Sequence, residues 1–394
     1  MKTIIVSTCA AIGALLTLLA ASANAQPLTP LEQLGKALLF DNNLSTPPGQ
    51  SCAACHAPEV GFTGPTSDVN AHGAVYQGAV RNRFGNRKPP TAAYGGDSPV
   101  LHYDADEELW VGGMFWDGRA TGWTLGDPLA EQAMGPFLNP LEQNNPTAKL
   151  VCEKVAKSTY ASLFKQVWGP NSLDPKKDVA GTYERIARSI AAYERSAEVN
   201  PFSSKYDYWL KGQATLTEQE EQGRLLFEGK GMCSACHLSQ PGPGGEPPLF
   251  TDFTYDNLGV PPNPENPFYF ISAEWNPAGL GFVDYGLGDF LKGAGYPPEV
   301  YETEMGKHKV PTLRNVDKRP YPEFVKAFGH NGYFKSLEAI THFYNTRDVI
   351  TENWPAPEVP ENVNTDELGN LGLTPEEEAA IVAFMKTLTD GYTP

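Results

Sequence analysis

Cys52-Ala53-Ala54-Cys55-His56 and Cys233-Ser234-Ala235-Cys236-His237 are two copies of one pattern, in which a histidine directly follows the second of two cysteines. Three kinds of site use such a cysteine pair: a redox-active dithiol, a structural zinc ion and a covalently attached c-type haem. A redox dithiol is expected between a strand and a helix of a thioredoxin-like fold, and neither copy has that context. A zinc ion bound by both pairs would use four thiolates and would not require the histidines.

Haem attachment uses every residue of the pattern. The cysteines form thioether bonds to the haem vinyl groups, and the adjacent histidine becomes an axial ligand of the iron. Because the chain contains only 6 cysteines and 7 histidines, two chance copies are improbable. We therefore predict two covalent c-type haems, one bound by Cys52, Cys55 and His56, the other by Cys233, Cys236 and His237.

An internal repeat surrounds these motifs. Residues 28–40 and 216–227 share a Leu-Thr start, a glutamate three residues after the threonine, a glycine and a Leu-Leu-Phe end, and each precedes one motif. Thr followed three residues later by Glu is typical of a helix N-terminus. Far downstream of each motif, residues 182–196 and 374–387 have the apolar spacing of a second helix. The sequence predicts a mainly α fold of two fused cytochrome c-like domains with long loops, 26–205 and 206–394.

Composition supports a globular chain with few regular elements. The 394 residues include 38 glycines and 35 prolines without a collagen-like period, and 41% are hydrophobic. This mixture predicts short elements joined by long ordered loops. The net charge of −17 makes a nucleic-acid-binding surface improbable.

The N-terminus is typical of an export signal. Lys2 precedes an apolar stretch, and Ala23-Asn24-Ala25 has the form of a cleavage site. We expect residues 1–25 to be a signal peptide, with an uncleaved anchor as the alternative, and the mature protein to be periplasmic without a membrane span. Cys152 belongs to neither motif, and its expected role is a small buried apolar side chain.

Several further motifs carry a resemblance. They are residues 115–120 (FWDGRA), 131–136 (EQAMGP), 310–315 (VPTLRN) and 330–332 (HNG). Together with the two Cys-x-x-Cys-His motifs, they make nearly the whole mature chain similar to the bacterial di-haem cytochrome c peroxidase family, which includes the MauG-type enzymes. An insertion of five residues near 121–126 departs from the family pattern.

The resemblance implies that the His56 haem reacts with peroxide. Glu142 would then move the proton from the iron-bound oxygen to the leaving oxygen, and Gln132 would hold the peroxide by hydrogen bonding. Trp116 would relay electrons between the haems. Taken without the resemblance, Trp116 is more typical of a core residue and Glu142 of a surface carboxylate.

Three further ligands follow from the resemblance. His72 would cap the first haem iron at rest, although a solvated loop histidine is an equal alternative. Asn86 would bind an inter-domain calcium ion. Tyr344 would be the distal ligand of the second haem, where a phenolate lowers the reduction potential and a methionine raises it. The alternative is that Tyr344 is a packed aromatic side chain and that Met305, His308 or no residue is the distal ligand.

Three functions are compatible with this sequence. The first is a peroxidase that reduces hydrogen peroxide with electrons from a small c-type cytochrome or cupredoxin. The second is a MauG-like enzyme that oxidises residues of a partner protein. The third is a di-haem electron carrier without chemistry of its own, which would not need Gln132 and Glu142. We place the peroxidase first; a homodimer is compatible with it.

Overall fold

The computed structural model describes residues 27–394. The expected signal peptide and its cleavage site lie outside these residues. None of the helices within the described part of the chain is both long and apolar enough to span a bilayer.

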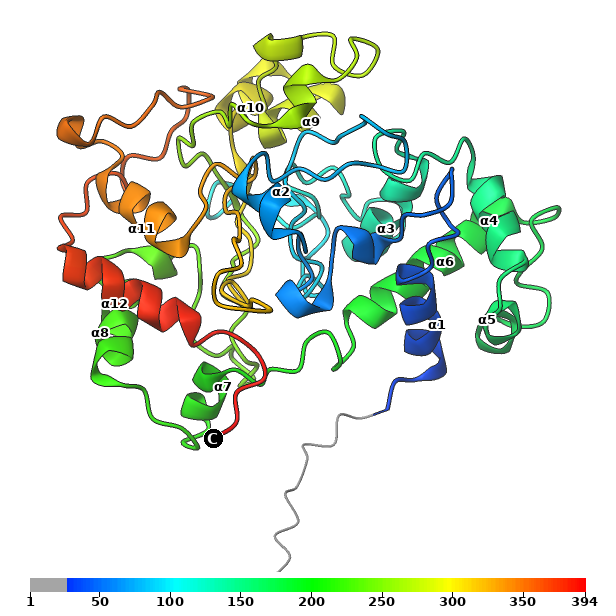
Figure 1. Ribbon diagram of the computed structural model, residues 1–394, viewed down its shortest axis with the longest axis horizontal. Helices are drawn as coiled ribbons and strands as arrows, with labels where there is room; N and C mark the ends of the chain where they lie inside the picture. The colour runs from blue at the N-terminus through cyan, green and yellow to red at the C-terminus, as the bar shows by residue number, and fades with distance from the viewer. Residues whose placement is uncertain (1–26) are drawn as a thin grey trace, which may run out of the picture.

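Helices dominate the described chain; one group precedes Lys205 in the sequence and the other begins there, and α9 and α10 of the second group lie apart from α8, α11 and α12 (Figure 1). The helices of the first group are α1 (Pro30–Leu39), α2 (Ser67–Ala71), α3 (Pro128–Leu138), α4 (Ala148–Ala156), α5 (Ala161–Trp168) and α6 (Val179–Glu194). Those of the second are α7 (Lys205–Leu210), α8 (Glu218–Glu228), α9 (Gly286–Gly293), α10 (Pro298–Tyr301), α11 (Leu337–Thr346) and α12 (Pro375–Lys386). The mainly α prediction is confirmed.

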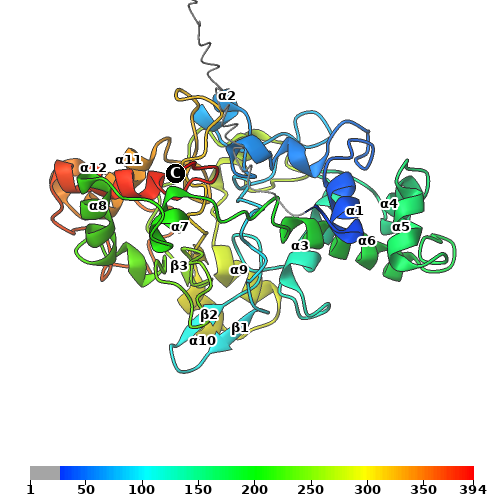
Figure 2. The same cartoon turned by 90° about the horizontal axis from the view of Figure 1, so that it is seen from below.

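Two short antiparallel strand pairs lie among the loops. β1 (His102–Asp104) pairs with β2 (Leu109–Val111), with Tyr103 opposite Trp110. β3 (Tyr255–Asp256) pairs with β4 (His308–Lys309). The β1–β2 hairpin and helices α9 and α10 lie side by side in Figure 2, because Trp110 shares a small apolar cluster with Leu287 and Leu291.

The two copies of the repeat begin in the same way. Thr29 caps α1 and Thr217 caps α8, each in a reciprocal capping box with the glutamate three residues later. The expected downstream helices are present as α6 and α12, and α12 has a third capping box.

Each copy also packs its first helix against its last helix. Gly35 of α1 lies so close to α6 that a Cβ atom there would be 1.9 Å from the Ser189 carbonyl oxygen. Gly223 of α8 lies against α12 in the same way, 1.8 Å from the Ala380 carbonyl oxygen. The glycine of the repeat therefore marks a close backbone crossing in both halves.

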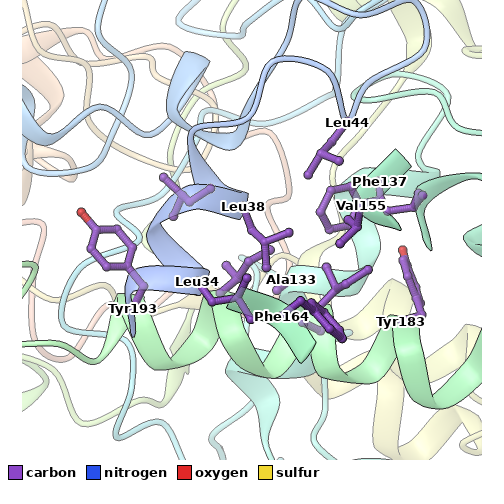
Figure 3. Packing of buried hydrophobic residues seen from close by; sticks show 14 of the residues in the cluster. Leu34, Leu38, Leu44, Ala133, Phe137, Val155, Phe164, Tyr183 and Tyr193 are labelled. Atoms are coloured by element: carbon purple, nitrogen blue, oxygen red, sulfur yellow. The ribbon is translucent and has the colours of Figure 1, made fainter. Parts of the chain in front are cut away.

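Two separate apolar cores follow from this packing. The first extends from Leu34 to Val199 and is shown in Figure 3, and the second extends from Tyr206 to Leu388. Full burial of a leucine such as Leu34 contributes about 1.5–3 kcal/mol. Cys152 is fully buried in the first core, as expected.

A buried polar cluster joins the two halves. The Asp390 carboxylate accepts hydrogen bonds from the Tyr94 hydroxyl at 2.7 Å, the Asn315 amide at 2.8 Å and the Ser203 backbone N–H at 2.9 Å. The fully buried guanidinium of Arg314 binds Asp207 at 2.7 Å and lies over the ring of Tyr94. The halves are thus fixed to one another by hydrogen bonds as well as by apolar contact.

Candidate functional site

The two motif histidines have matching environments. The Nδ1–H of His56 donates to the carbonyl oxygen of Phe62 at 3.1 Å, and that of His237 donates to the carbonyl oxygen of Phe250 at 2.9 Å. Burial lowers the pKa of both imidazoles, so that each is neutral near pH 7. A neutral ring with its Nδ1–H engaged leaves Nε2 free to bind a metal ion.

The two carbonyl groups depend on an unusual backbone conformation. Phe62 and Phe250 have φ angles of 57° and 55°, which non-glycine residues adopt only where the surrounding structure enforces it. The same strain at the same place in both halves indicates that it serves to orient the ligand histidine. Sequence reasoning did not find these phenylalanines, because nothing in the residue type signals a left-handed backbone.

The motif cysteines fit haem attachment better than they fit zinc. Burial, followed in Cys55 by the charge of Glu142, raises the pKa of the Cys52 and Cys55 thiols to about 12, so that they are poor thiolate ligands. Cys52 packs against the first apolar core and Cys233 against the second. Among residues 27–394, no metal-binding group combines cysteines of both pairs. The described residues therefore do not bring the two cysteine pairs together at one metal ion.

A large cavity surrounds the second motif. It contains about 1760 Å³ of space between protein atoms, a figure that includes space open to solvent. Cys233, Cys236 and His237 line it together with Tyr344 of α11. Burial raises the pKa of Tyr344 well above its usual range. Its hydroxyl is therefore protonated unless a metal ion stabilises the phenolate.

The first motif also borders a cavity, which Cys55, Gln50 and Tyr76 line. The Gln50 amide nitrogen lies 3.9 Å from the sulfur of Cys55, and that of Gln143 lies 3.7 Å from the sulfur of Cys52. The amide oxygens of both glutamines are buried without a hydrogen-bond partner. The two unpartnered amide oxygens and the two neighbouring thiols are consistent with a prosthetic group bound at this place.

Glu142 lies beside the first motif, in the turn after α3. The Asn139 side-chain amide donates to its carboxylate at 2.8 Å, and burial raises the pKa of the carboxyl group. Its charge contributes to the raised pKa of both motif thiols. Gln132 is half-buried on α3, ahead of this turn. A buried carboxyl group with a raised pKa at this place can serve as an acid–base group that accepts and returns a proton.

Trp116 lies between the two motifs. It is 7% exposed, lines the cavity of the second motif, and donates from its indole N–H to the Lys88 carbonyl oxygen at 2.8 Å. The same cavity reaches Pro90, whose backbone also interacts with the His56 ring. The indole therefore lines the cavity of the second motif near a residue, Pro90, that contacts the histidine of the first motif.

The loop inserted after Trp116 is hydrogen-bonded to helix α3 through Glu131. The Glu131 carboxylate accepts hydrogen bonds from the backbone N–H groups of Gly122 and Leu125 at 2.6 and 2.7 Å. The glutamate of the EQA motif thus holds the insertion in place.

His72 is at the surface. Its side chain is 63% exposed, and its Nδ1 lies 3.2 Å from the carboxylate of Glu265. This placement matches the alternative of a solvated loop histidine, and a role in capping the iron stays a prediction.

Asn86 is not surrounded by the oxygen ligands that calcium prefers. Its amide nitrogen lies 3.4 Å from the Asp284 carboxylate, which the Arg87 guanidinium already binds through two hydrogen bonds of 2.6 Å. The carboxylate nearest to Asn86 is thus already paired with a guanidinium.

Two buried histidine–thiol sites, with an acidic group at one and a tyrosine at the other, define a di-haem c-type oxidoreductase. A family model described as di-haem cytochrome c peroxidase matches residues 29–215. The chain is 34% identical over 372 residues to the methylamine utilization protein MauG of Paracoccus denitrificans, covering 91% of this chain and 88% of that protein. It is 30% identical to the cytochrome c551 peroxidase of Nitrosomonas europaea, covering 91% and 80%.

A solved structure shares the fold. The diheme peroxidase BthA of Burkholderia thailandensis superposes with a TM-score of 0.76 at 32% identity, covering 93% of this chain and 87% of that one. The chain belongs to the di-haem cytochrome c peroxidase family, and the resemblance stated from its motifs is confirmed. It is an oxidoreductase of the peroxidase type.

Proposed function

We propose that the protein reduces hydrogen peroxide to water at the His56 haem, with electrons that reach it through the His237 haem. The observation that carries this proposal is the buried Glu142 carboxyl group, which lies beside the first motif and has a raised pKa. When bound, the first haem supplies an iron centre that binds peroxide and accepts electrons. A plain electron carrier would not need an acid–base group there.

The residues around this haem have separate roles in proton transfer, substrate binding and electron transfer. Glu142 accepts the proton of the bound peroxide oxygen and returns it to the oxygen that leaves as water. The Asn139 amide fixes the orientation of this carboxylate, and the nearby Arg119 charge limits the rise of its pKa. Gln132 holds the substrate by hydrogen bonding, and Trp116 couples the two haem sites.

The remaining assignments are part of the same proposal. Residues 26–205 and 206–394 form the two cytochrome c-like domains, each with one covalent haem, and residues 1–25 direct the chain to the periplasm. The electron donor is a small c-type cytochrome or cupredoxin with a basic docking face, because this chain carries a net charge of −17. A homodimer is compatible with these roles. Calcium at Asn86 stays a prediction that no contact of the described residues supports.

The test is a turnover measurement on the protein with both haems attached. We expect it to oxidise two equivalents of reduced small cytochrome for each hydrogen peroxide consumed, with no oxidation in the absence of peroxide. A protein that exchanges electrons with the cytochrome but consumes no peroxide would be an electron carrier, and the proposal would be wrong.

A second function is favoured by Tyr344. This tyrosine lines the cavity of the His237 motif. The chain is also 34% identical to the MauG protein of Paracoccus denitrificans. A phenolate ligand would keep the second haem at a low potential, so that a high-potential cytochrome would reduce it only uphill. In that case the oxidising equivalents of peroxide are used on residues of a partner protein.

The Tyr344→Met variant separates the two functions. If Tyr344 is the ligand, the variant should raise the reduction potential of the second haem and acquire the spectrum of a methionine-ligated iron, whereas Tyr344→Phe should give neither. An increased rate with reduced cytochrome in Tyr344→Met would favour the MauG-like function for the unaltered protein. An unchanged potential in both variants would remove Tyr344 from the iron.

A further inference from the structure

The β1–β2 hairpin carries oxidisable aromatic side chains to the edge of the molecule (Figure 2). Tyr103 and Trp110 are opposite each other in the strand register, and their ring centroids lie 5.7 Å apart at an interplanar angle of 62°. The ring of Tyr296 also meets Trp110 edge-on, at 5.3 Å. Tyr103 is 48% exposed, whereas Trp110 is 5% exposed. An oxidisable ring at the surface is therefore in contact with one in the interior.

Tyr255 connects this hairpin to the segment that contains Trp116. Its ring belongs to the same buried cluster as Trp110, and its hydroxyl donates to the Gly112 carbonyl oxygen at 2.6 Å. A Cβ atom at Gly118 would lie 2.5 Å from the same hydroxyl oxygen. Tyr255 therefore contacts the chain two residues after Trp110 and again two residues after Trp116.

These rings together form a route along which electrons can move. Tunnelling becomes much slower as the distance grows, so several short steps between oxidisable rings carry a charge farther than one long step. Trp116 lines the cavity of the second motif. From there Tyr255, Trp110 and Tyr103 follow in order, and the last of them is at the surface.

The surroundings of each ring determine where a radical can be stabilised by loss of a proton. The indole N–H of Trp110 is buried without a hydrogen-bond partner, so an oxidised Trp110 keeps its proton and regains its electron from a neighbour. The Tyr255 hydroxyl is bound to a backbone carbonyl, which is too weak a base to take its proton. Tyr103 is half exposed, so its hydroxyl proton can pass to water. The end of the route is therefore Tyr103.

We propose that oxidising equivalents formed from peroxide reach Tyr103 through Trp116, Tyr255 and Trp110, and that Tyr103 there oxidises a phenol or an aromatic amine without negative charge. This inference rests on the proposed function, which supplies the oxidising equivalents. For a phenol, one hydrogen peroxide takes up one electron and one proton from each of two donor molecules. The products are two water molecules and two phenoxyl radicals.

The surface around Tyr103 determines the class of donor. Tyr103 and the half-buried Tyr296 both lie against Trp110, and their rings offer a surface on which a flat aromatic molecule can pack. All residues of the adjoining turn, 104–108, are acidic except Ala105. Their charge repels anions and favours neutral or cationic donors.

The test uses the protein with both haems attached, hydrogen peroxide as the oxidant and guaiacol as the neutral phenol. Without any donor, freeze-quenched EPR after an equimolar addition of peroxide should show a tyrosyl radical, and peptide mapping should find oxidation at Tyr103. Tyr103→Phe and Trp110→Phe should lose both the radical signal and the oxidation of guaiacol. Tyr103→Phe changes only an exposed hydroxyl group and so guards against misfolding.

Tyr321→Phe is the matched control. Tyr321 is 49% exposed, like Tyr103, but the ring that it contacts is the non-oxidisable Phe324. This variant should keep the radical signal and the guaiacol rate of the wild type. The haem spectrum after peroxide addition shows separately whether the oxidising equivalents are formed.

Two results would overturn the inference. If peroxide is consumed and the haem spectrum changes, but Tyr103→Phe and Trp110→Phe match the wild type in radical signal and guaiacol rate, the route is wrong and the proposed function stands. If peroxide is not consumed and the haem spectrum stays unchanged, the proposed function is wrong and the inference is wrong with it.

Discussion

Replacing Glu142 by glutamine removes the acid–base group and little else. The Asn139 amide donates to one carboxylate oxygen at 2.8 Å, and the glutamine carbonyl oxygen can accept the same hydrogen bond. The side chain keeps its size, but it can no longer take up and return a proton. General acid–base groups contribute about 10²–10⁴-fold, so we expect peroxide turnover to fall by that factor, or about 3–5 kcal/mol in barrier height at 1.36 kcal/mol per tenfold.

Steady-state peroxide consumption with a reduced cytochrome as donor measures this loss. Because burial raises the pKa of Glu142, the reactive carboxylate is present above that pKa and is lost as the pH falls through it. The wild-type rate should therefore decline on the acid side, and the glutamine variant should lack this decline. Glu153→Gln on α4, a partly exposed carboxylate near Lys149, is the matched control. Both variants should retain both haems.

The reasoning would be refuted by a Glu142→Gln variant with near-normal turnover and an unchanged acid limb. A variant that loses haem or unfolds at a lower temperature would also contradict it. Replacing a buried carboxyl group of raised pKa by a neutral amide should not destabilise the fold at neutral pH.

Three further outcomes are expected. Asp207→Asn leaves the fully buried Arg314 without its anionic partner, and should lower the free energy of unfolding by about 3–5 kcal/mol in a urea titration, where a loss under about 1 kcal/mol would contradict this role. Burial raises the pKa of Glu194 to about 8, above the unfolded value, so its protonation stabilises the fold at low pH and this stability is lost as the pH rises from about 5 to 8. Glu194→Gln should remove that slope, on the order of 1.4 kcal/mol per pH unit, and equal slopes in both proteins would count against it. His72→Ala should leave the ferric EPR and optical spectra of the first haem unchanged, because the ring is exposed and faces Glu265; an altered spectrum would place His72 at the iron after all.

Local sequence signals predicted much of the helical frame. The capping boxes at Thr29 and Thr217 and the amphipathic patterns of α6 and α12 act within a few residues, so the pattern alone identifies them. The sequence shows that a glycine recurs in both copies of the repeat, but not why it is there. Its reason, a backbone crossing between Gly35 and Ser189, depends on a contact far along the chain.

The site beyond the haem motifs could not be predicted in the same way. Glu265, which faces His72, lies 193 residues away in sequence, so no local pattern could reveal that the histidine is at the surface. His308 of β4, His330 and Glu358 come from segments far apart in the sequence that share no periodicity. The fold alone brings them together, in the wall of the cavity of the second motif.

The position of Asp390 has a consequence for how the molecule is assembled. This residue bonds Tyr94 of the first half and Asn315 of the second, and it follows both haem motifs in the chain. A chain that emerges N-terminus first can fold its first half before the second is present. The hydrogen bond between Asp390 and Tyr94 can form only after both motifs have emerged. This contact between the halves is therefore among the last to become available as the chain emerges.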